Sequence, residues 1–277
     1  MRRGTVFLTL VLFSVLRFNA GAETIKLFSF NMQIFGVSKA ANNEVTAILA
    51  DIVSRSSVTA VQEVRSVDIG PVTRFMRMLP PQYAFLLGPR EGRSSSKEQY
   101  WIIYDSSKMR LLDERTWPDP EDIFERNPLG AWFQTSGTFD FILINTHIQP
   151  SNAVREIAAL PEVARYYQEL WGETDVALVG DFNADGSYYN ENDLTNLFPE
   201  EAYRIIIGND YDTTLAASDN TYDRIVITAS AIEDYAGACG VLRFDDEYDF
   251  SALSIQPRQV SDHYPVWAEF YTEADTD

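Results

Sequence analysis

The sequence has a single cysteine, Cys239, among its 277 residues. One cysteine excludes an intramolecular disulfide, so the chain does not belong to the class of small disulfide-stabilised scaffolds. A small apolar core residue is a simpler interpretation of Cys239 than a reactive thiol. A chain of this length can bury a substantial core.

Long hydrophobic runs are also missing, apart from one at the N-terminus. There an uncharged, largely apolar stretch, 6–16, follows Met1-Arg2-Arg3 and leads into Ala20-Gly21-Ala22. This layout is typical of a secretory signal peptide. The stretch is well short of the ~20 residues that a membrane-spanning helix needs. We therefore predict a leader at 1–22, a secreted mature chain at 23–277 that forms one domain, and no attachment to a membrane.

Positive charge is scarce, because 22 Lys and Arg stand against 41 Asp and Glu, a formal net charge of −19 at pH 7. Loss of Arg2, Arg3 and Arg17 with the leader would leave the mature chain at −22. Such a protein repels nucleic acid at long range. Charge alone therefore argues against a nucleic-acid partner.

Apolar-rich runs predict seven strands, and several are apolar at nearly every position, as in strands covered on both faces. The predicted strands are 24–30, 58–64, 100–104, 139–146, 175–179, 222–228 and 264–270. Helical patterns at 43–55, 72–78 and 152–170 each lie between two strands. The first carries the stripe of a helix packed against a sheet, formed by Val45, Ile48, Leu49 and Ile52. No internal repeat is evident, and the pattern predicts a single α/β domain with mixed sheets.

Polar residues recur where these strands stop, at the positions where sites assemble in α/β sheets. They are Asn31, Glu63, His147, Asp181, Asn183, Asp262 and His263. Taken singly, each has an ordinary explanation, such as a turn former, a solvated carboxylate or a hydrogen-bonded structural histidine. The whole chain has only two histidines, however, and both lie in this set. Their placement favours one shared site.

Such a set suits the hydrolysis of a phosphodiester. The attacking water must lose a proton and the departing oxygen must gain one, which two imidazoles can do near neutral pH. Glu63, Asp181 and Asp262 supply oxygen ligands suited to Mg²⁺, Mn²⁺ or Ca²⁺ rather than zinc. A bound cation and neutral amides would stabilise the added negative charge of the transition state. Asp181 and Asn183 would project to the same side if the strand continues through both.

Seven short motifs run in order along the mature chain. They are Ser29-Phe30-Asn31, Val61-Gln62-Glu63-Val64-Arg65, Gly92-Arg93 with Lys97-Glu98-Gln99-Tyr100, Asn145-Thr146-His147, Gly180-Asp181-Phe182-Asn183-Ala184-Asp185, Tyr222-Asp223-Arg224-Ile225 and Ser261-Asp262-His263-Tyr264-Pro265-Val266. In this order and spacing they resemble the deoxyribonuclease I family of the endonuclease/exonuclease/phosphatase superfamily. The resemblance extends over nearly the whole mature chain.

The resemblance implies a four-layered α/β/β/α sandwich, with two mixed β-sheets packed face to face and helices outside. It implies a secreted, monomeric endonuclease that hydrolyses double-stranded DNA with Mg²⁺ or Mn²⁺, together with Ca²⁺, and leaves 5′-phosphate ends. Contact through the minor groove, where the sequence code is degenerate, would make cleavage nearly independent of sequence.

The resemblance also implies roles for single residues. His147 and His263 resemble the acid–base pair, oriented by Glu98 and Asp223 respectively. Glu63 resembles the principal magnesium ligand. The residues that resemble the family's remaining metal and phosphate contacts are Asn31, Asp181, Asn183 and Asp262. Three arginines resemble residues that contact DNA, namely Arg65, Arg93 and Arg126. A calcium loop is implied at Asp212, Thr214 and Ser218, although Ala216 interrupts its pattern.

Several features depart from the family pattern. Ser96 stands where the family stacks a tyrosine on DNA, which predicts weaker DNA binding because such stacking contributes about 1–3 kcal/mol. Gly186 and Asn220 stand at the positions of the family's disulfide. The actin-contacting strand of the vertebrate enzymes is not recognisable at 85–89, so actin binding is not carried over.

Two alternatives stay open at this point. Another phosphodiesterase or phosphatase of the superfamily, acting on lipids or inositol phosphates, would share the metal and histidine motifs. Arg65, Glu98 and the lack of an apolar hairpin for entering a membrane favour DNA. A non-catalytic binding protein on the same fold is the second alternative, but none of the acid–base or metal residues is broken.

Overall fold

A computed structural model describes residues 22–273 and 275. The predicted leader therefore lies, except for Ala22, outside the described residues. Within the described part, no helix combines the length and apolar character needed to cross a membrane.

Twelve of the described segments form two mixed sheets of six strands each. The first has the order β11 (Tyr235–Val241), β12 (Val266–Tyr271), β1 (Thr24–Phe35), β2 (Val58–Val64), β4 (Gln99–Asp105), β3 (Tyr83–Leu87). The second has the order β5 (Met109–Thr116), β6 (Leu129–Thr135), β7 (Asp140–His147), β8 (Val176–Asp181), β10 (Asp223–Thr228), β9 (Tyr203–Ile205). Each sheet has one parallel pair, β1 with β2 and β7 with β8, and its other pairs are antiparallel.

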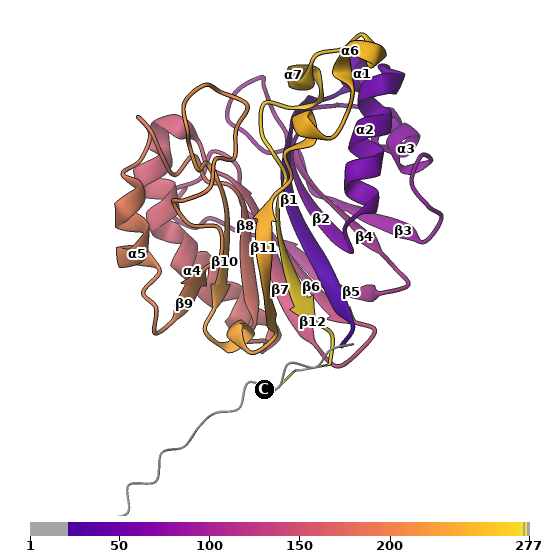
Figure 1. Cartoon of the computed structure of the whole chain (residues 1–277). Helices are drawn as coiled ribbons and strands as arrows, with labels where there is room; N and C mark the ends of the chain where they lie inside the picture. Colours follow the sequence, from indigo (N-terminus) through magenta and orange to yellow (C-terminus); the bar gives the residue numbers. More distant parts are fainter. Residues whose placement is uncertain (1–21, 274, 276–277) are drawn as a thin grey trace, which may run out of the picture.

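Helices cover the outer face of each sheet (Figure 1). The first sheet carries α2 (Asn43–Ser54) and α3 (Gly70–Met76), and the second carries α4 (Ala153–Trp171) and α5 (Leu194–Leu197). Three short helices, α1 (Val37–Ala40), α6 (Phe250–Leu253) and α7 (Pro257–Val260), lie at one end of the sandwich. Single 3₁₀ turns occur at Pro150–Asn152, Glu191–Asp193, Ser230–Ile232 and Phe244–Asp246. The predicted four-layered sandwich is confirmed.

Three apolar layers hold these elements together. One lies between the sheets, and each of the other two lies between a sheet and its helices. The predicted stripe of α2 is buried in one of the outer layers, as Val45, Ile48, Leu49 and Ile52 are each at most 3% exposed. The helix begins at Asn42, whose side chain accepts a hydrogen bond from Val45 N, the usual way to satisfy a free amide at a helix start.

Candidate active site

The inner faces of the two sheets end in polar residues at one edge of the sandwich. Side chains alternate along a strand, so residues two apart share a face. On β7, Phe141 and Leu143 pack between the sheets, and the same face continues through Asn145 to His147. The same alternation places Asp181 after Val179 on β8, Asp223 before Ile225 on β10, Asn31 after Leu27 and Ser29 on β1, and Glu98 before Tyr100 on β4. The site is therefore the polar continuation of the inter-sheet core.

Asp181 lies at the centre of this edge. Its Oδ2 is 3.5 Å from Nε2 of His147 and 3.6 Å from Nε2 of His263. The same oxygen accepts a hydrogen bond from Asn31 Nδ2 at 3.1 Å. Both imidazoles, one from each side of the sandwich, thus turn the same ring nitrogen toward one carboxylate oxygen.

The other nitrogen of His147 faces Glu98. Its Nδ1 lies 3.1 Å from Glu98 Oε1, and Arg126 Nε lies 2.7 Å from the same oxygen. Arg126 Nε also donates to the carbonyl of His147 at 3.0 Å. Burial acts to raise the pKa of Glu98, but the charges of His147, Arg126 and Arg65 outweigh it and lower this pKa to about 2. Glu98 is therefore ionised and holds the ring in place.

The other nitrogen of His263 faces Asp223 in the same way, with Nδ1 2.8 Å from Oδ2. Asp223 is fully buried, and burial raises its pKa to about 6. Burial acts to lower the pKa of His263, but the carboxylates of Asp223 and Asp181 raise it to about 10. The pair therefore favours an imidazolium beside a carboxylate.

Glu63 reaches the edge through an irregularity in its strand. The register of β2 shifts between Val61 and Val64, and Glu63 itself has φ +62°. Its Oε1 accepts from Asn31 Nδ2 at 3.3 Å and its Oε2 from the amide of Ile34 at 2.9 Å. Since Asn31 donates to both Glu63 and Asp181, this amide joins the two carboxylates.

Two groups in the described part of the chain bring at least three acidic or histidine ligand atoms within 4.8 Å of one another. They are Glu63, Glu98 and His147, and Asp181, Asp223 and His263. The oxygen-rich set around Asn31, Glu63 and Asp181 fits a hard divalent cation such as Mg²⁺ or Mn²⁺.

Two predicted ligands lie differently from the expectation. β8 ends at Asp181, and Asn183 follows with φ +47°, so the strand does not continue through both residues. Asn183 instead donates its side-chain amide to Ile148 O at 2.9 Å and its backbone amide to Asp181 Oδ1 at 3.0 Å. Asp262 lies at the rim, with a side chain 31% exposed and 3.8 Å from Arg258 NH2.

The three predicted DNA-contacting arginines occupy different environments. Arg65 lies at the rim, where it contacts Glu63 at 3.2 Å and donates to Ser96 Oγ at 2.8 Å. Arg126 is only 9% exposed and is held by Glu98. Arg93 donates to the carbonyl and carboxylate of Asp122 and to the carbonyl of Phe124.

The predicted calcium ligands all have protein partners. Asp212 lies 3.3 Å from Arg243 NH1 and accepts from the amide of Thr214. Ser218 Oγ accepts from the side chain of Asn220 at 2.6 Å. A calcium ion here would have to replace these contacts.

Lys39 is a member of the site that the sequence reasoning missed. Its Nζ donates to Met32 O at 2.8 Å and Val260 O at 2.9 Å. Burial lowers its pKa to about 8, although Asp262 and Glu63 act to raise it. The ammonium thus ties the end of β1 to the segment that leads into His263. No sequence signal separates Lys39 from an ordinary surface lysine.

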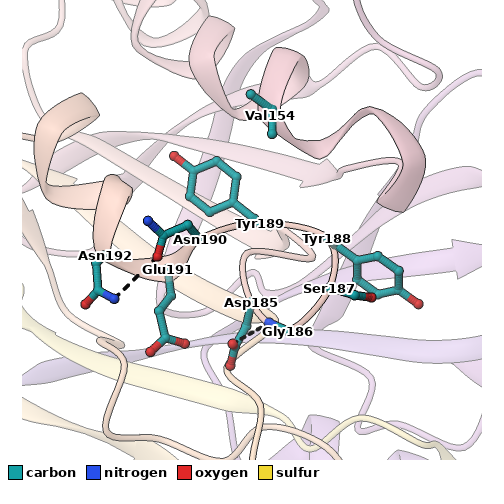
Figure 2. A pocket seen from close by; sticks show the side chains of 9 residues that line it. All are labelled: Val154, Asp185, Gly186, Ser187, Tyr188, Tyr189, Asn190, Glu191 and Asn192. Atoms are coloured by element: carbon teal, nitrogen blue, oxygen red, sulfur yellow. Dashed lines mark hydrogen bonds between the residues drawn. The ribbon is translucent and has the colours of Figure 1, made fainter.

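A pocket of about 460 Å³ opens on the loop that follows β8 (Figure 2). It is lined by Val154 and by eight consecutive residues, Asp185, Gly186, Ser187, Tyr188, Tyr189, Asn190, Glu191 and Asn192. None of the predicted site residues lines it. The candidate site at the polar edge between the sheets is therefore separate from this pocket.

Comparison with known proteins adds sequence and fold relatives. No family model matches the chain. It is 32% identical over 262 residues to deoxyribonuclease-1-like 2 of Mus musculus, covering 91% of this chain and 94% of that protein. It is 30% identical over 259 residues to deoxyribonuclease-1 of Homo sapiens, covering 89% and 92%. A solved endonuclease/exonuclease/phosphatase family protein from Bacteroides thetaiotaomicron has a TM-score of 0.62 at 15% identity, covering 92% of this chain and 98% of that one. The structural match concerns the fold alone.

Proposed function

Because the chain belongs to the deoxyribonuclease I family, we propose that it is a secreted endonuclease that hydrolyses phosphodiester bonds of double-stranded DNA with a divalent cation. One observation carries this proposal. Asp181 Oδ2 lies between the Nε2 atoms of His147 and His263, and each ring has its own carboxylate at Nδ1. Two oriented imidazoles beside an oxygen-rich cation site match the needs of phosphodiester hydrolysis.

The two imidazoles divide the proton transfers. One Nε2 accepts the proton of the attacking water, and the other donates a proton to the departing oxygen. Glu98 lies 3.1 Å from Nδ1 of His147 and Asp223 lies 2.8 Å from Nδ1 of His263. A carboxylate at this place favours a hydrogen on Nδ1 and leaves each Nε2 facing the reaction centre. Neither carboxylate needs to contact the substrate.

Glu63, Asn31 and Asp181 would hold Mg²⁺ or Mn²⁺. The cation supplies charge stabilisation to the phosphoryl oxygens when bound. The amide of Asn31 is a neutral donor at the same place and keeps the two carboxylates together. Asp262 at the rim and Asn183 behind Asp181 complete the set, the second by holding Asp181 in position.

DNA would contact the rim around Arg65. This arginine is partly exposed and close to Glu63, so it can reach the groove beside the scissile phosphate. Calcium at Asp212, Thr214 and Ser218 remains a proposal. A higher melting temperature on adding Ca²⁺ at constant Mg²⁺ would support it, and an unchanged one would count against it.

The test uses purified residues 23–277 with supercoiled plasmid and Mg²⁺. We expect nicked circles, then linear DNA, with ends that accept label from polynucleotide kinase only after phosphatase treatment, as 5′-phosphates do. Asp181→Asn serves as the control for a contaminating nuclease. Unchanged cleavage in excess EDTA would contradict the metal-dependent mechanism. Intact plasmid with phosphate release from inositol phosphates or lipid vesicles would favour another member of the superfamily.

A further inference from the structure

We propose that Gln62 and Asn145, two amide side chains buried between the sheets, are positioning residues that fix the spacing between the two halves of the site. This inference rests on the proposed function, because it concerns the same reaction centre. Both residues are fully buried, at 0% exposure.

The site needs such a spacer because its halves belong to different sheets. Asn31, Glu63 and Glu98 come with the first sheet, and His147 and Asp181 with the second. Two of the closest contacts cross between the sheets: Asn31 Nδ2 to Asp181 Oδ2 at 3.1 Å, and Glu98 Oε1 to His147 Nδ1 at 3.1 Å. Any sliding of one sheet over the other would change both distances.

The amide pair lies directly behind these contacts. Gln62 Nε2 donates to Asn145 Oδ1 at 2.7 Å, and Asn145 Nδ2 donates to Val61 O at 3.0 Å. Gln62 also reaches Ser29 Oγ at 3.3 Å on β1. Gln62 directly precedes Glu63, and Asn145 lies two residues before His147. The hydrogen bond between Gln62 and Asn145 thus links β2 to β7 in the buried layer directly next to the site.

The rest of the layer between the sheets is mainly apolar. Apolar burial is non-directional and fixes no register by itself, whereas hydrogen bonds demand defined distances and angles. Oε1 of Gln62 has no hydrogen-bond partner in the part of the chain that the structure describes. A buried, unpaired amide oxygen is unfavourable, so it offsets part of the stability that the hydrogen bonds of the two amides contribute. The amides therefore contribute geometry more than stability, as single buried polar residues do when they set the register of coiled coils.

The discriminating variant is the double substitution Gln62→Met with Asn145→Leu. It removes both amides together, so neither amide is left facing an empty partner. Val61 O and Ser29 Oγ each lose one donor, while the unpaired Oε1 of Gln62 disappears, and we expect a melting temperature close to that of the wild type. If the sheets then shift, kcat on plasmid should fall about 10- to 100-fold with little change in KM, because small displacements of reacting groups have effects of this order. The swap Gln62→Asn with Asn145→Gln conserves total volume and one amide-to-amide hydrogen bond, and should recover part of kcat.

Tyr167→Phe is the matched control. Tyr167 is buried in the outer layer under α4, where its hydroxyl lies 2.7 Å from Arg115 O and 3.1 Å from Pro128 O and accepts from the amide of Gly130. Its loss should lower the melting temperature and leave kcat unchanged. A purely structural role of the amides predicts the pattern of this control for the double variant, a lower melting temperature with wild-type kcat. Wild-type kcat in the folded double variant, whatever its melting temperature, would overturn the proposal.

Mn²⁺ affinity, measured by calorimetry without DNA, provides a second measurement. Carboxylates from both sheets would hold this ion, so the double variant should bind Mn²⁺ more weakly than the wild type and Tyr167→Phe should not. A wild-type protein that binds Mn²⁺ but cleaves no DNA would refute the proposed function while the affinity comparison still tests the spacer. Equal Mn²⁺ affinity in the double variant and the wild type would refute the proposed positioning role of Gln62 and Asn145.

Discussion

At the scale of single residues, the site is a row of alternating carboxylates and imidazoles centred on Asp181. Glu98, His147, Asp181, His263 and Asp223 follow one another with no gap above 3.6 Å. All of these side chains are at most 12% exposed. Since charge interactions are strong in such a poorly solvated place, each imidazole is held by the carboxylates on both its sides.

This arrangement predicts that substitutions at these five residues lower kcat to different extents. His147→Ala or His263→Asn should lower kcat about 10²–10⁴-fold, because each removes a proton-transfer group. Asp223→Asn should reduce kcat less, since an amide oxygen can still accept the Nδ1 hydrogen. Plasmid nicking rates measure this, with circular dichroism as a check on folding. A His263→Asn protein with near wild-type activity would rule out the assigned role.

The pKa of Glu98 predicts how stability responds to acid. This pKa is lowered from 4.5 to about 2 in the folded protein, so the stabilisation is complete above pH 4.5 and is lost as the pH falls toward 2. Between pH 5 and pH 3 the wild type should lose roughly 2 kcal/mol of unfolding free energy through this one group. Urea unfolding of the wild type and of Glu98→Gln measures the difference. Parallel pH profiles for the two proteins would contradict the charge pairing.

The sequence identified most members of this site but not their arrangement. His147 and His263 were identifiable because they are the only histidines and both follow conspicuous motifs. The spacing of Asn183 from Asp181 suits either a continued strand or a turn, and only the structure shows the turn, with φ +47° at Asn183 and its side chain on Ile148 O. Arg93 looked free to contact DNA, since its partners Asp122 and Phe124 lie about 30 residues further along the chain.

At the scale of elements, strand position in the sheet decided what the sequence could predict. The seven predicted strands correspond to β1, β2, β4, β7, β8, β10 and β12, all in the interior of a sheet. The four edge strands, β3, β5, β9 and β11, were missed. β5, β9 and β11 are partly exposed and lack an unbroken apolar run, whereas β3 was missed although its five residues are all apolar. The interior strand β6 was also missed. Its run is interrupted by Gly130, where a Cβ would lie 2.5 Å from the ring of Tyr167.

The two sheets also correspond to each other element by element. Their strand orders match position by position, and the parallel pair of each is joined by a long helix, α2 or α4. Each half contributes to the site from the same strand positions, with Asn31 on β1 and His147 on β7, and Glu98 just before β4 and Asp223 at the start of β10. No repeat is visible in the sequence, because the shared feature is topology rather than residue identity. The site therefore lies between two sheets that share a topology but contribute different side chains.

The loop between β8 and β10 yields a prediction about stability. A Cβ at Gly186 would lie 3.1 Å from Asn220 Oδ1, so the two positions are neighbours. Gly186→Cys with Asn220→Cys should form a disulfide whose loop closure is worth about 3–4 kcal/mol. The positive φ at Gly186 offsets about 1–2 kcal/mol of this. The oxidised double variant should melt several degrees above the wild type.

Dithiothreitol should reverse this gain and leave the wild type unchanged, because Cys239 has no partner for an intramolecular bond. Each single cysteine variant serves as a control for the strain alone. A disulfide that forms, by mass or gel mobility, without any gain in melting temperature would mean that the existing contacts already hold the loop. Thr221 contributes such contacts through Asp185 and Tyr211.

At the scale of the whole molecule, charge is distributed unevenly along the chain. The segment 65–97 has six basic residues and only two acidic ones, although the whole chain carries −19. This segment includes the rim residue Arg65 and directly precedes Glu98. For the proposed function, this basic segment would attract a DNA duplex locally, although the protein as a whole repels it. Salt screens the repulsion, so it acts only over about one Debye length.

The long-range repulsion between the acidic protein and DNA can be tested with substitutions far from the site. Glu200 and Glu201 are exposed and lie before the edge strand β9. Replacing both with lysine changes the net charge by four units, which should raise kcat/KM on plasmid about two- to five-fold at low ionic strength by faster association. Glu200→Gln with Glu201→Gln changes it by two units and should give a smaller gain. Because the effect acts at long range, the ratio of variant to wild type should approach one at about 0.5 M salt, where the Debye length is only a few ångströms. A gain that persists at high salt would instead indicate a direct contact between DNA and this loop, and the absence of any gain would mean that the local basic segment already governs the approach.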